Sequence, residues 1–229
     1  MDTTREPRYE FGEPDDWALA QGHRLVAGVD EVGRGAMAGP LVAAAVILEP
    51  EAELTLVNDS KLLSPEQRDE AYEQVRERAT AWSIGVVDAE MVDRLNVWGA
   101  TCLAMRRALE GLSTQPDFTL VDGLEPRGMK HPHQAFIGGD ACSPRMGAAS
   151  ILAKVTRDRA MARLAITCPG YGFESNKGYA TPQHKEAVRR LGPSPAHRRR
   201  YWFVTDLRSD HLPFDPADLR RISEYGGGE

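Results

Sequence analysis

The chain contains few cysteines, and their placement argues against cysteine-based architectures. Only three occur among 229 residues, at positions 102, 142 and 168, and none belongs to a C-x-x-C pair. A disulfide framework or a zinc ribbon needs closely paired cysteines, so neither is expected. A reducing compartment suits such a chain, and we expect a cytoplasmic location.

Long apolar runs are also absent from the sequence. The longest, residues 41–48, is far shorter than the roughly 20 residues that cross a bilayer as a helix. The first twenty residues are acidic and have no apolar stretch, so we expect no secretory signal and no membrane partner. Hydrophobic residues make up 41% and charged residues 27%, which is typical of a globular domain rather than of a disordered chain.

Negative charge is concentrated at the two ends of the chain. The net charge is −6; residues 1–23 contribute −4 and residues 209–229 contribute −3, which leaves +1 for the rest. Within that rest, residues 185–208 hold seven basic and two acidic side chains. Such a basic segment attracts phosphate groups, although taken alone it is more often a solvated surface.

Hydrophobic patterning and capping residues predict an α/β chain. Ser64 and Pro65 begin a helix as N-cap and first helical residue, and Asp88 caps a short helix. A mixed sheet covered by helices is expected, because a run of strands is followed by strands alternating with helices. The expected strands are 25–30, 41–48, 81–87, 117–121 and 135–138, and the expected longer helices are 65–80, 96–112, 145–166 and 182–191.

Four acidic residues stand where expected strands or turns end. Asp30 and Glu31 end the first strand, Asp122 follows the strand at 117–121, and Asp140 follows two glycines. Functional side chains gather at strand ends beside glycine turns. Each acid alone is more simply explained as a cap or turn residue, but four together at the ends of core elements favour a site.

Carboxylate oxygens are hard ligands, which suit Mg²⁺ or Mn²⁺ better than zinc. Two such ions about 4 Å apart activate water and stabilise the leaving oxygen in phosphodiester cleavage. The four acids are therefore candidate ligands for this chemistry.

A glycine-rich turn, Gly33-Arg34-Gly35, directly follows the first two acids. Glycines allow a close backbone approach to a sugar–phosphate, and Arg34 adds positive charge. A dinucleotide-binding fingerprint does not fit, because the next glycine, Gly39, comes one residue late and a strand follows instead of a helix. A P-loop does not fit either, since no Gly-Lys-Ser or Gly-Lys-Thr occurs.

Seven ordered blocks carry a family resemblance that covers about residues 24–205. They are 30–40, 59–64, 96–108, Val121-Asp122-Gly123 with Gly139-Asp140, Ala148-Ala149-Ser150-Ile151-Leu152-Ala153-Lys154-Val155-Thr156-Arg157-Asp158, Lys177-Gly178-Tyr179-Ala180-Thr181 with His184, and 192–199. Together they resemble ribonuclease HII, the type 2 ribonuclease H, in its bacterial form. Any one block would be a weak signal, whereas seven in order are specific.

The resemblance implies an α/β, ribonuclease H-like fold: a mixed five-stranded sheet flanked by helices, with a C-terminal helical part. It implies an endonuclease that hydrolyses the RNA strand of RNA/DNA hybrids and cuts 5′ of single ribonucleotides embedded in duplex DNA. Two-metal hydrolysis with Mg²⁺ or Mn²⁺ would leave 3′-hydroxyl and 5′-phosphate ends. The implied partners are RNA/DNA hybrids and ribonucleotide-containing duplex DNA, and we expect a monomer.

By the same resemblance, Asp30, Glu31, Asp122 and Asp140 would be the catalytic, metal-binding acids. Gly33, Arg34 and Gly35 would read the 2′-hydroxyl, which alone separates RNA from DNA at one nucleotide. Tyr179 would stack on the sugar at the ribonucleotide–deoxyribonucleotide junction and exclude a second ribose, although by itself it fits a half-buried aromatic. The candidate phosphate-binding residues are Lys61, Lys154, Arg157, Arg198 and Arg199.

The chain departs from the family pattern just after Asp140. Pro144 and Gly147 are expected to loosen or delay the start of the long helix. We expect an acidic, loosely ordered N-terminal extension at 1–23, a ribonuclease H-like catalytic domain with C-terminal helices at 24–205, and an acidic tail at 206–229.

Three other functions are consistent with parts of this pattern. A DNA nuclease or strand-transfer enzyme of the same fold would also use carboxylates and metal, but would not require a 2′-hydroxyl. A non-catalytic module that only holds hybrids is disfavoured by the acids, because negative charge opposes phosphate binding. A small-molecule phosphatase is the weakest of the three.

Overall fold

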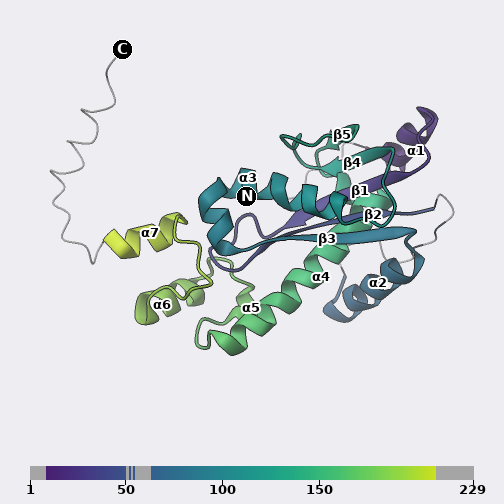
Figure 1. The fold of residues 1–229 in the computed structure, drawn as a ribbon. Coiled ribbons are helices and arrows are strands. Elements are labelled where there is room, and N and C mark those ends of the chain that lie inside the picture. Colours follow the sequence, from purple (N-terminus) through teal and green to yellow (C-terminus); the bar gives the residue numbers. More distant parts are fainter. Residues whose placement is uncertain (1–8, 50–51, 53, 55–62, 210–229) are drawn as a thin grey trace, which may run out of the picture.

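The computed structural model describes residues 9–49, 52, 54 and 63–209, so Lys61 lies outside the described residues. Figure 1 shows a central sheet with helices on both sides and a group of short helices at one end. The elements are α1 Glu13–Ala20, β1 Val26–Val32, β2 Leu41–Ile47, α2 Pro65–Arg78, β3 Ala81–Val87, α3 Ala89–Glu110, β4 Phe118–Asp122, β5 His133–Phe136, the 3₁₀ turn η2 Gly139–Ala141, α4 Pro144–Thr167, α5 Phe173–Asn176, α6 Pro182–Leu191 and α7 Trp202–Ser209.

The five strands form one mixed sheet in the order β3-β2-β1-β4-β5. The strands β1, β2 and β3 are antiparallel neighbours, whereas β4 runs parallel to β1 and β5 runs parallel to β4. This sheet and its flanking helices confirm the α/β, ribonuclease H-like fold expected from the sequence. Its topology places the carboxyl ends of β1, β4 and β5 at one edge of the sheet.

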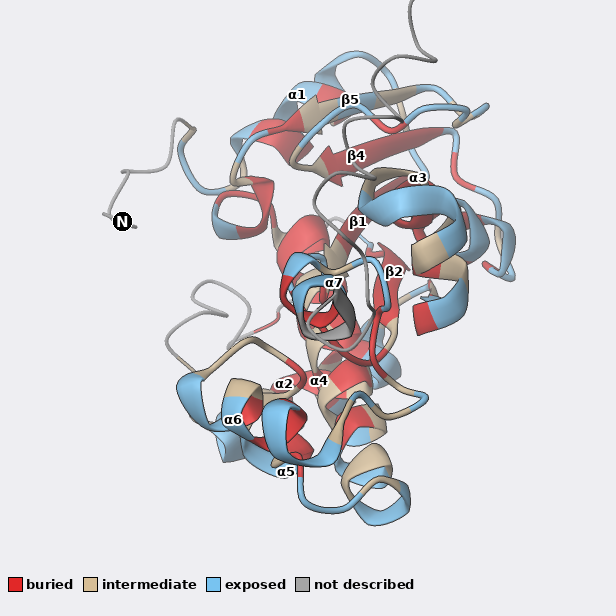
Figure 2. Ribbon diagram, turned by 90° about the vertical axis from the view of Figure 1, so that its left-hand side faces the viewer, coloured by how far each residue is buried: buried red, intermediate tan, exposed pale blue. Residues whose placement is uncertain are grey.

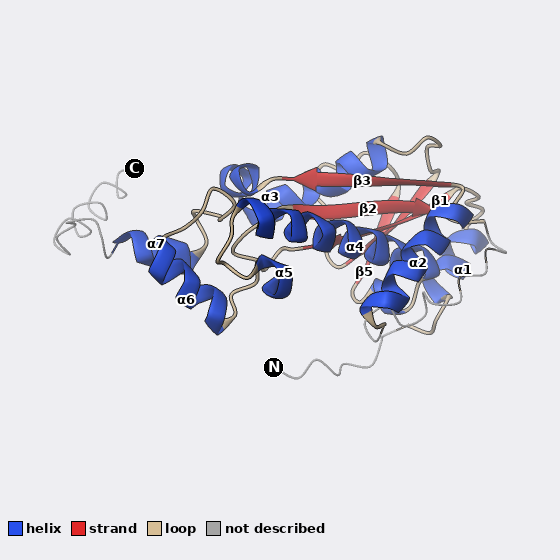
Figure 3. Cartoon of the chain, turned by 90° about the horizontal axis from the view of Figure 1, so that it is seen from below, coloured by secondary structure: helices blue, strands red, loops and turns tan. Residues whose placement is uncertain are grey.

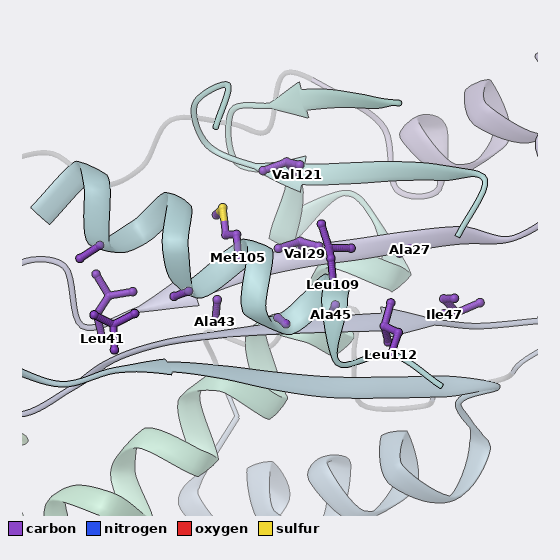
Figure 4. Close-up of a cluster of buried hydrophobic side chains, with 14 of the residues drawn as sticks. Ala27, Val29, Leu41, Ala43, Ala45, Ile47, Met105, Leu109, Leu112 and Val121 are labelled. Atoms are coloured by element: carbon purple, nitrogen blue, oxygen red, sulfur yellow. The ribbon is translucent and has the colours of Figure 1, made fainter. Parts of the chain in front are cut away.

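The central strand β2 is buried along its whole length, as its unbroken apolar sequence predicts. Alternate residues face opposite sides because the side-chain period of a strand is two. Leu41, Ala43 and Ala45 join Met105 and Leu109 of α3 in one buried cluster, which Figure 4 shows in close-up.

The opposite face of the sheet packs against α2 and α4. There, Val42, Ala44 and Val46 of β2 form a second buried cluster with Tyr72 of α2 and Leu152 of α4. Figure 2 shows the resulting buried interior along β1, β2 and β4. Burial of apolar surface on both faces, worth about 25 cal/mol per Å², is the main force that holds the layers together.

The helix α4 lies unusually close to β1, and this approach depends on one glycine. A Cβ atom added at Gly28 would clash with the backbone of Arg145 and Met146. Figure 3 shows α4 running along the sheet, with α1 and α2 towards one end and α6 and α7 at the other. The helix therefore connects the region after β5 with the C-terminal helices.

The C-terminal helices pack against the turn that follows β1, which we call the glycine loop (residues 33–40). A third buried cluster contains Met37 and Ala38 of the glycine loop together with residues from α4, α5, α6 and the N-terminal part of α7. Figure 1 shows these helices gathered beyond the end of α4. The described helices include none that is long and apolar enough to cross a membrane.

Part of the N-terminal extension expected at residues 1–23 is helical, whereas residues 1–8 lie outside the described residues. Residues 13–20 form α1, in which Ala18 is fully buried and the ring of Trp17 lies edge-on to that of Phe118, with 5.6 Å between ring centroids. Apolar contacts from only a few side chains anchor this acidic helix to the sheet, so composition alone did not reveal it.

A buried ion pair fixes α1 to the start of α4. Arg145 Nη1 donates to Asp15 Oδ1 over 2.7 Å, and both side chains are only 5% exposed. Arg145 Nη2 also donates to the carbonyl oxygen of Leu48 over 2.9 Å. Because two charges buried together stabilise each other only while both are present, each partner depends on the other.

The expectation that Pro144 and Gly147 loosen or delay the start of the long helix is wrong, because α4 begins at Pro144 itself. Pro144 occupies the first turn of α4, where its missing N–H is not needed, and the Ser143 hydroxyl accepts from the Met146 N–H over 3.1 Å. The strand expected at 135–138 lies two residues earlier, where residues 133–136 pair with 119–122 of β4. It does not extend to Gly138, which adopts a left-handed conformation with φ of 77°.

Other expected caps are confirmed. Ser64 forms a capping box with Gln67 at the start of α2, and Asp88 accepts from the Met91 N–H at the start of α3. The separate helices expected after Asp88 and from position 96 are the two parts of α3, which is kinked at Asn96.

Replacement of Asp15 by alanine is expected to lower the free energy of unfolding by about 3–5 kcal/mol, because the Arg145 charge then stays buried without a partner. Urea titration of the full chain measures this change. The neighbouring Asp16 is exposed, so Asp16→Ala is the matched control and should change stability by no more than about 1 kcal/mol. Equal effects of the two variants would contradict the importance of the ion pair.

Candidate active site

Three aspartates converge at the carboxyl edge of the parallel strands. Asp30 lies near the end of β1, Asp122 is the last residue of β4, and Asp140 lies in η2, shortly after β5. One carboxylate oxygen from each residue lies within 4.8 Å of those of the other two. The structure thus brings together side chains that are 92 and 18 positions apart in the sequence.

Backbone N–H groups hold two of these carboxylates. The N–H of Gly139 donates to Asp122 Oδ1 over 2.6 Å, and the N–H of Glu31 donates to Asp30 Oδ1 over 2.7 Å. The first bond ties the turn that carries Asp140 directly to the end of β4. The relative positions of the acids are therefore set by main-chain contacts rather than by flexible side chains alone.

Burial and mutual repulsion disfavour full ionisation of this group. Burial raises the pKa of Asp30 well above its ordinary value, and the negative charges of Asp122 and Glu31 raise it further. Burial also raises the pKa of Asp122, with Asp140 as the next contributor. Carboxylates this close share protons or require a cation, so the cluster is suited to positively charged ligands.

The fourth predicted acid, Glu31, lies beside this cluster. It lines a cavity of about 270 Å³ together with Asp140, Arg68, Ser150 and Lys154. Burial raises the pKa of Glu31, whereas Arg34 lowers it, with 3.1 Å between Arg34 Nη1 and Glu31 Oε1. Four carboxylates with only oxygen donors have the chemistry that Mg²⁺ and Mn²⁺ prefer.

The glycine loop begins next to the acids and contains two different kinds of glycine. Gly33 has a φ of +94°, and a Cβ there would clash with the side chain of Arg157, so the fold itself requires glycine. Gly35 is exposed, and a Cβ there would meet no atom within 4 Å. The free space above Gly35 leaves its backbone accessible to a ligand.

Two buried arginines hold the glycine loop from below. Arg157 donates from Nε to the carbonyl oxygen of Pro40 over 2.9 Å and from Nη2 to that of Ala38 over 3.2 Å. Arg198 donates from Nη1 to the Arg34 carbonyl over 3.0 Å and from Nε to the Gly39 carbonyl over 3.2 Å. These guanidinium groups, expected from the sequence to bind phosphate, are inside the protein and bonded to its main chain.

Tyr179 lies next to the glycine loop. Its half-exposed ring is 5.2 Å from Cζ of Arg157, a distance typical of a cation–π contact. The preceding carbonyl, that of Gly178, accepts hydrogen bonds from the N–H groups of Met37 and Ala38. The tyrosine and the loop are thus one connected unit.

The remaining basic candidates are dispersed. Lys154 lies at the wall of the acidic cavity, where Nζ contacts Asp158 Oδ1 over 2.8 Å. Arg199 is exposed and lines a separate cavity of about 620 Å³ with Arg94 and Arg200.

Some residues of the site were not singled out from the sequence. Ser150 hydrogen-bonds to Asp30 and lowers its pKa, partly offsetting the effect of burial. Arg68 lines the acidic cavity, and the Trp98 ring lies 5.7 Å from Cζ of Arg34. Ser150 and Arg68 do lie in or beside blocks that resemble the family, but only the fold shows that they face the acids.

A mixed five-stranded sheet with acids gathered at the carboxyl ends of its parallel strands is the arrangement of ribonuclease H-like nucleases. The family model described as ribonuclease HII matches residues 27–205, and the chain belongs to that family. The chain is therefore an endonuclease of the ribonuclease H type, a hydrolase that acts on RNA/DNA substrates.

Named relatives agree over most of the chain. The ribonuclease HII of Xanthomonas campestris is 47% identical over 210 residues, which cover 88% of each chain. That of Enterococcus faecalis is 42% identical over 198 residues, which cover 86% of this chain and 77% of the relative. The crystal structure of ribonuclease H2 from Pyrococcus horikoshii is 27% identical with a TM-score of 0.70, covering 81% of this chain and 97% of that one.

We expect Asp30→Asn to stabilise the protein in the presence of a chelator at neutral pH. Because the pKa of Asp30 is raised on folding, the folded state binds more protons, and the free energy of unfolding falls as pH rises from the ordinary aspartate pKa through the raised one. Asp30→Asn relieves this repulsion, and each kcal/mol gained in the free energy of unfolding should raise Tm by about 2–4 °C.

Thermal unfolding between pH 4 and 8, with chelator and then with Mg²⁺, measures this effect. The added ion should raise the Tm of the unmodified protein more than that of Asp30→Asn. Glu77→Gln removes an exposed acid in α2 and serves as the control. An Asp30→Asn variant that is less stable than the unmodified protein with chelator at every pH would contradict the prediction.

Proposed function

We propose that the chain hydrolyses the RNA strand of RNA/DNA hybrids and also cuts 5′ of single ribonucleotides embedded in duplex DNA, leaving 3′-hydroxyl and 5′-phosphate ends. The observation that carries the proposal is the aspartate cluster, in which one carboxylate oxygen of each residue lies within 4.8 Å of those of the other two, beside a glycine loop with an accessible backbone. We further propose that the protein is a monomer and that it acts in the cytoplasm, a reducing compartment that suits its three free thiols.

In this proposal Asp30, Glu31, Asp122 and Asp140 hold two Mg²⁺ or Mn²⁺ ions. The donor set fits, because it is made only of carboxylate oxygens and carries more negative charge than the buried edge can keep without cations. Bound ions would supply activation of the attacking water and stabilisation of the leaving oxygen. The bonds from the N–H groups of Gly139 to Asp122 and of Glu31 to Asp30 would fix where these carboxylates hold the ions.

Gly33, Arg34 and Gly35 are proposed to recognise the 2′-hydroxyl. Main-chain N–H and C=O groups of the loop can both donate to and accept from a hydroxyl, and DNA offers no such group at the same position. The bonds from Arg157 and Arg198 keep the loop in place before substrate arrives. We therefore assign these two arginines to positioning the loop rather than to contacting phosphate.

Tyr179 is proposed to pack on the sugar next to the ribonucleotide. Its ring is fixed beside Arg157 and can discriminate against a second ribose by steric exclusion. Lys154 and Arg199 are the exposed or partly exposed candidates for phosphate contacts within the described residues, and Lys61, outside them, stays a prediction.

One cleavage assay tests the proposal. Its substrates are a DNA duplex with a single ribonucleotide, a long RNA/DNA hybrid and an all-DNA duplex, each with Mg²⁺, Mn²⁺ or chelator. The protein should cut the first two with either ion, 5′ of the embedded ribonucleotide in the first, and leave the all-DNA duplex intact. Cleavage of all-DNA duplex would favour a general DNA nuclease, and binding without cleavage would favour a hybrid-binding module.

Replacement of Asp122 by asparagine tests the acids within this assay. We expect kcat to fall on the order of 10²-fold or more, the scale for removing one group that stabilises transition-state charge. Hybrid binding, measured by fluorescence anisotropy in chelator, should be unchanged or tighter because a negative charge is removed. Cleavage at the unmodified rate would contradict the assignment.

Gly35→Ala tests the loop separately from the fold. The variant should keep its thermal stability, since the added methyl group meets no protein atom. It should raise KM for the ribonucleotide-containing duplex roughly 10-fold or more, because the methyl group obstructs the substrate. Gly33→Ala is the comparison, and it should lower Tm because of its left-handed φ and the clash with Arg157. An unchanged KM for Gly35→Ala would contradict the recognition role.

A further inference from the structure

Two histidines are buried against each other beneath the segment that carries Tyr179. His184 in the first turn of α6 is 0% exposed, and His197 in the turn after α6 is 2% exposed. Their Nε2 atoms are 3.1 Å apart, which is hydrogen-bonding distance. The rings of Tyr171 and Phe173 pack around them.

The surrounding groups determine where the protons lie on both rings. The Ser194 N–H can only donate, and it points to His197 Nδ1 over 3.0 Å. The Ser194 hydroxyl lies 2.9 Å from the same nitrogen; its oxygen accepts from the Ala196 N–H, which leaves its proton to be donated to Nδ1. We therefore assign no proton to His197 Nδ1. A neutral His197 then has its proton on Nε2 and donates it to His184 Nε2. His184 must therefore carry its own proton on Nδ1, where the Tyr179 carbonyl accepts it over 2.8 Å.

This order of hydrogen bonds holds only while both rings are neutral. A proton added to either ring would set two donors against each other, either at the Nε2–Nε2 contact or at Ser194. Burial lowers the pKa of His184, and burial together with His184 lowers the pKa of His197 to about 4.

The charged and titratable groups around the pair are engaged elsewhere. The Tyr171 hydroxyl donates to the Gly192 carbonyl over 2.7 Å, and the Arg198 guanidinium donates to the carbonyls of Gly39 and Arg34. Neither group forms a hydrogen bond to the two histidines, which bond instead to each other, to Ser194 and to Tyr179.

The segment around His197 also holds the glycine loop. Ala38 and His197 form an isolated antiparallel bridge, the Gly39 N–H donates to the Ala196 carbonyl, and the Arg198 N–H donates to the Met37 carbonyl. His184 thus bonds to the Tyr179 carbonyl, and His197 belongs to the segment 196–198 that pairs with the glycine loop.

We propose that His184 and His197 are positioning residues that fix Tyr179 relative to the glycine loop and so set the preference for cutting at a ribonucleotide–deoxyribonucleotide junction. This proposal rests on the role proposed above for Tyr179. The Tyr179 carbonyl also accepts from the Thr181 N–H over 2.8 Å, a bond within its own turn. A pair of apolar residues would fill the volume of the two histidines, but it would not supply the second donor, which ties this carbonyl to α6 and, through His197, to the segment paired with the glycine loop.

The first test uses the unmodified protein and observes the protons directly. Imidazole ¹⁵N chemical shifts at pH 7 should identify His184 as the Nδ1–H form and His197 as the Nε2–H form, both neutral. A charged ring, or the opposite proton on either ring, would overturn the proposal.

The second test replaces His184 either by asparagine or by glutamine, whose amide groups lie at different distances from the backbone. The amide nitrogen of His184→Asn occupies the place of Nδ1 and can still donate to the Tyr179 carbonyl. The amide of His184→Gln reaches the place of Nε2, where its oxygen can accept from His197, but it does not supply a donor to Tyr179. The ratio of junction cleavage to cleavage within a long hybrid should fall about 5- to 10-fold in His184→Gln, as for one lost hydrogen bond. It should be close to normal in His184→Asn, and equal ratios in the two variants would overturn the proposal.

Tyr179→Ala separates this inference from the proposed function on which it rests. If Tyr179→Ala alone keeps the junction preference, the proposed role of Tyr179 fails. If Tyr179→Ala loses the preference but folded His184→Gln keeps it, the role of the histidine pair fails. The roles of Tyr179 and of the histidine pair are both supported if His184→Gln lowers the ratio of junction cleavage to hybrid cleavage when Tyr179 is present, and does not change that ratio further in Tyr179→Ala. Should His184→Gln not fold, the ¹⁵N shifts of the unmodified protein and the ratio in His184→Asn decide the inference.

Discussion

Repulsion among carboxylates confined at one edge of a buried sheet is the constraint around which the molecule is arranged. One carboxylate oxygen each of Asp30, Asp122 and Asp140 lies within 4.8 Å of the other two, and burial raises the pKa of the first two residues. A protein can maintain such an unfavourable group only if the rest of the fold prevents the side chains from moving apart. The parallel pairing of β1, β4 and β5 and the short bond from Gly139 to Asp122 provide that restraint.

The opposite arrangement holds a few residues away, where buried positive charge is bonded to neutral carbonyls. Arg157 and Arg198 lie beneath the glycine loop and donate to four of its carbonyl groups, those of Arg34, Ala38, Gly39 and Pro40. Asp30 and Glu31 directly precede the loop in sequence, so the end of β1 connects the negatively charged cluster with a loop whose shape is fixed before a ligand binds. Pre-organisation of this kind reduces the ordering cost on binding.

Local signals in the sequence predicted the regular elements well. Residues 81–87 form the expected strand, and Ser64 and Asp88 each cap a helix at the expected place. Caps and apolar periodicity act within a few residues of chain, which is why the sequence displays them directly. The short helices α5 and α7 were not located, because a few residues carry too little periodicity to distinguish a helix from a turn.

Long-range arrangement was harder to predict. Position at strand ends suggested that the acids form a site, but their convergence depends on the strand order, which puts β4 between β1 and β5. Likewise, the sequence does not distinguish an arginine on the surface from one bonded to main-chain carbonyls inside. Arg157 and Arg199 looked equivalent as basic residues of matched blocks, yet one is fully buried and the other exposed. Burial is decided by packing between elements, not by neighbours in the chain.

The contact between α1 and the start of α4 bears on how much of the chain the catalytic domain needs in order to fold. The family match begins at residue 27, after α1, and all four acids lie within it. However, Arg145 stands five residues after Asp140, and its charge is neutralised by Asp15 from outside that match. A chain trimmed to the matched region would keep every acid but leave a buried cation without its counter-ion close to the turn that carries Asp140. We therefore expect the stable unit of this nuclease to extend beyond the family match and to include α1, so that expression fragments or domain fusions are best begun before Glu13.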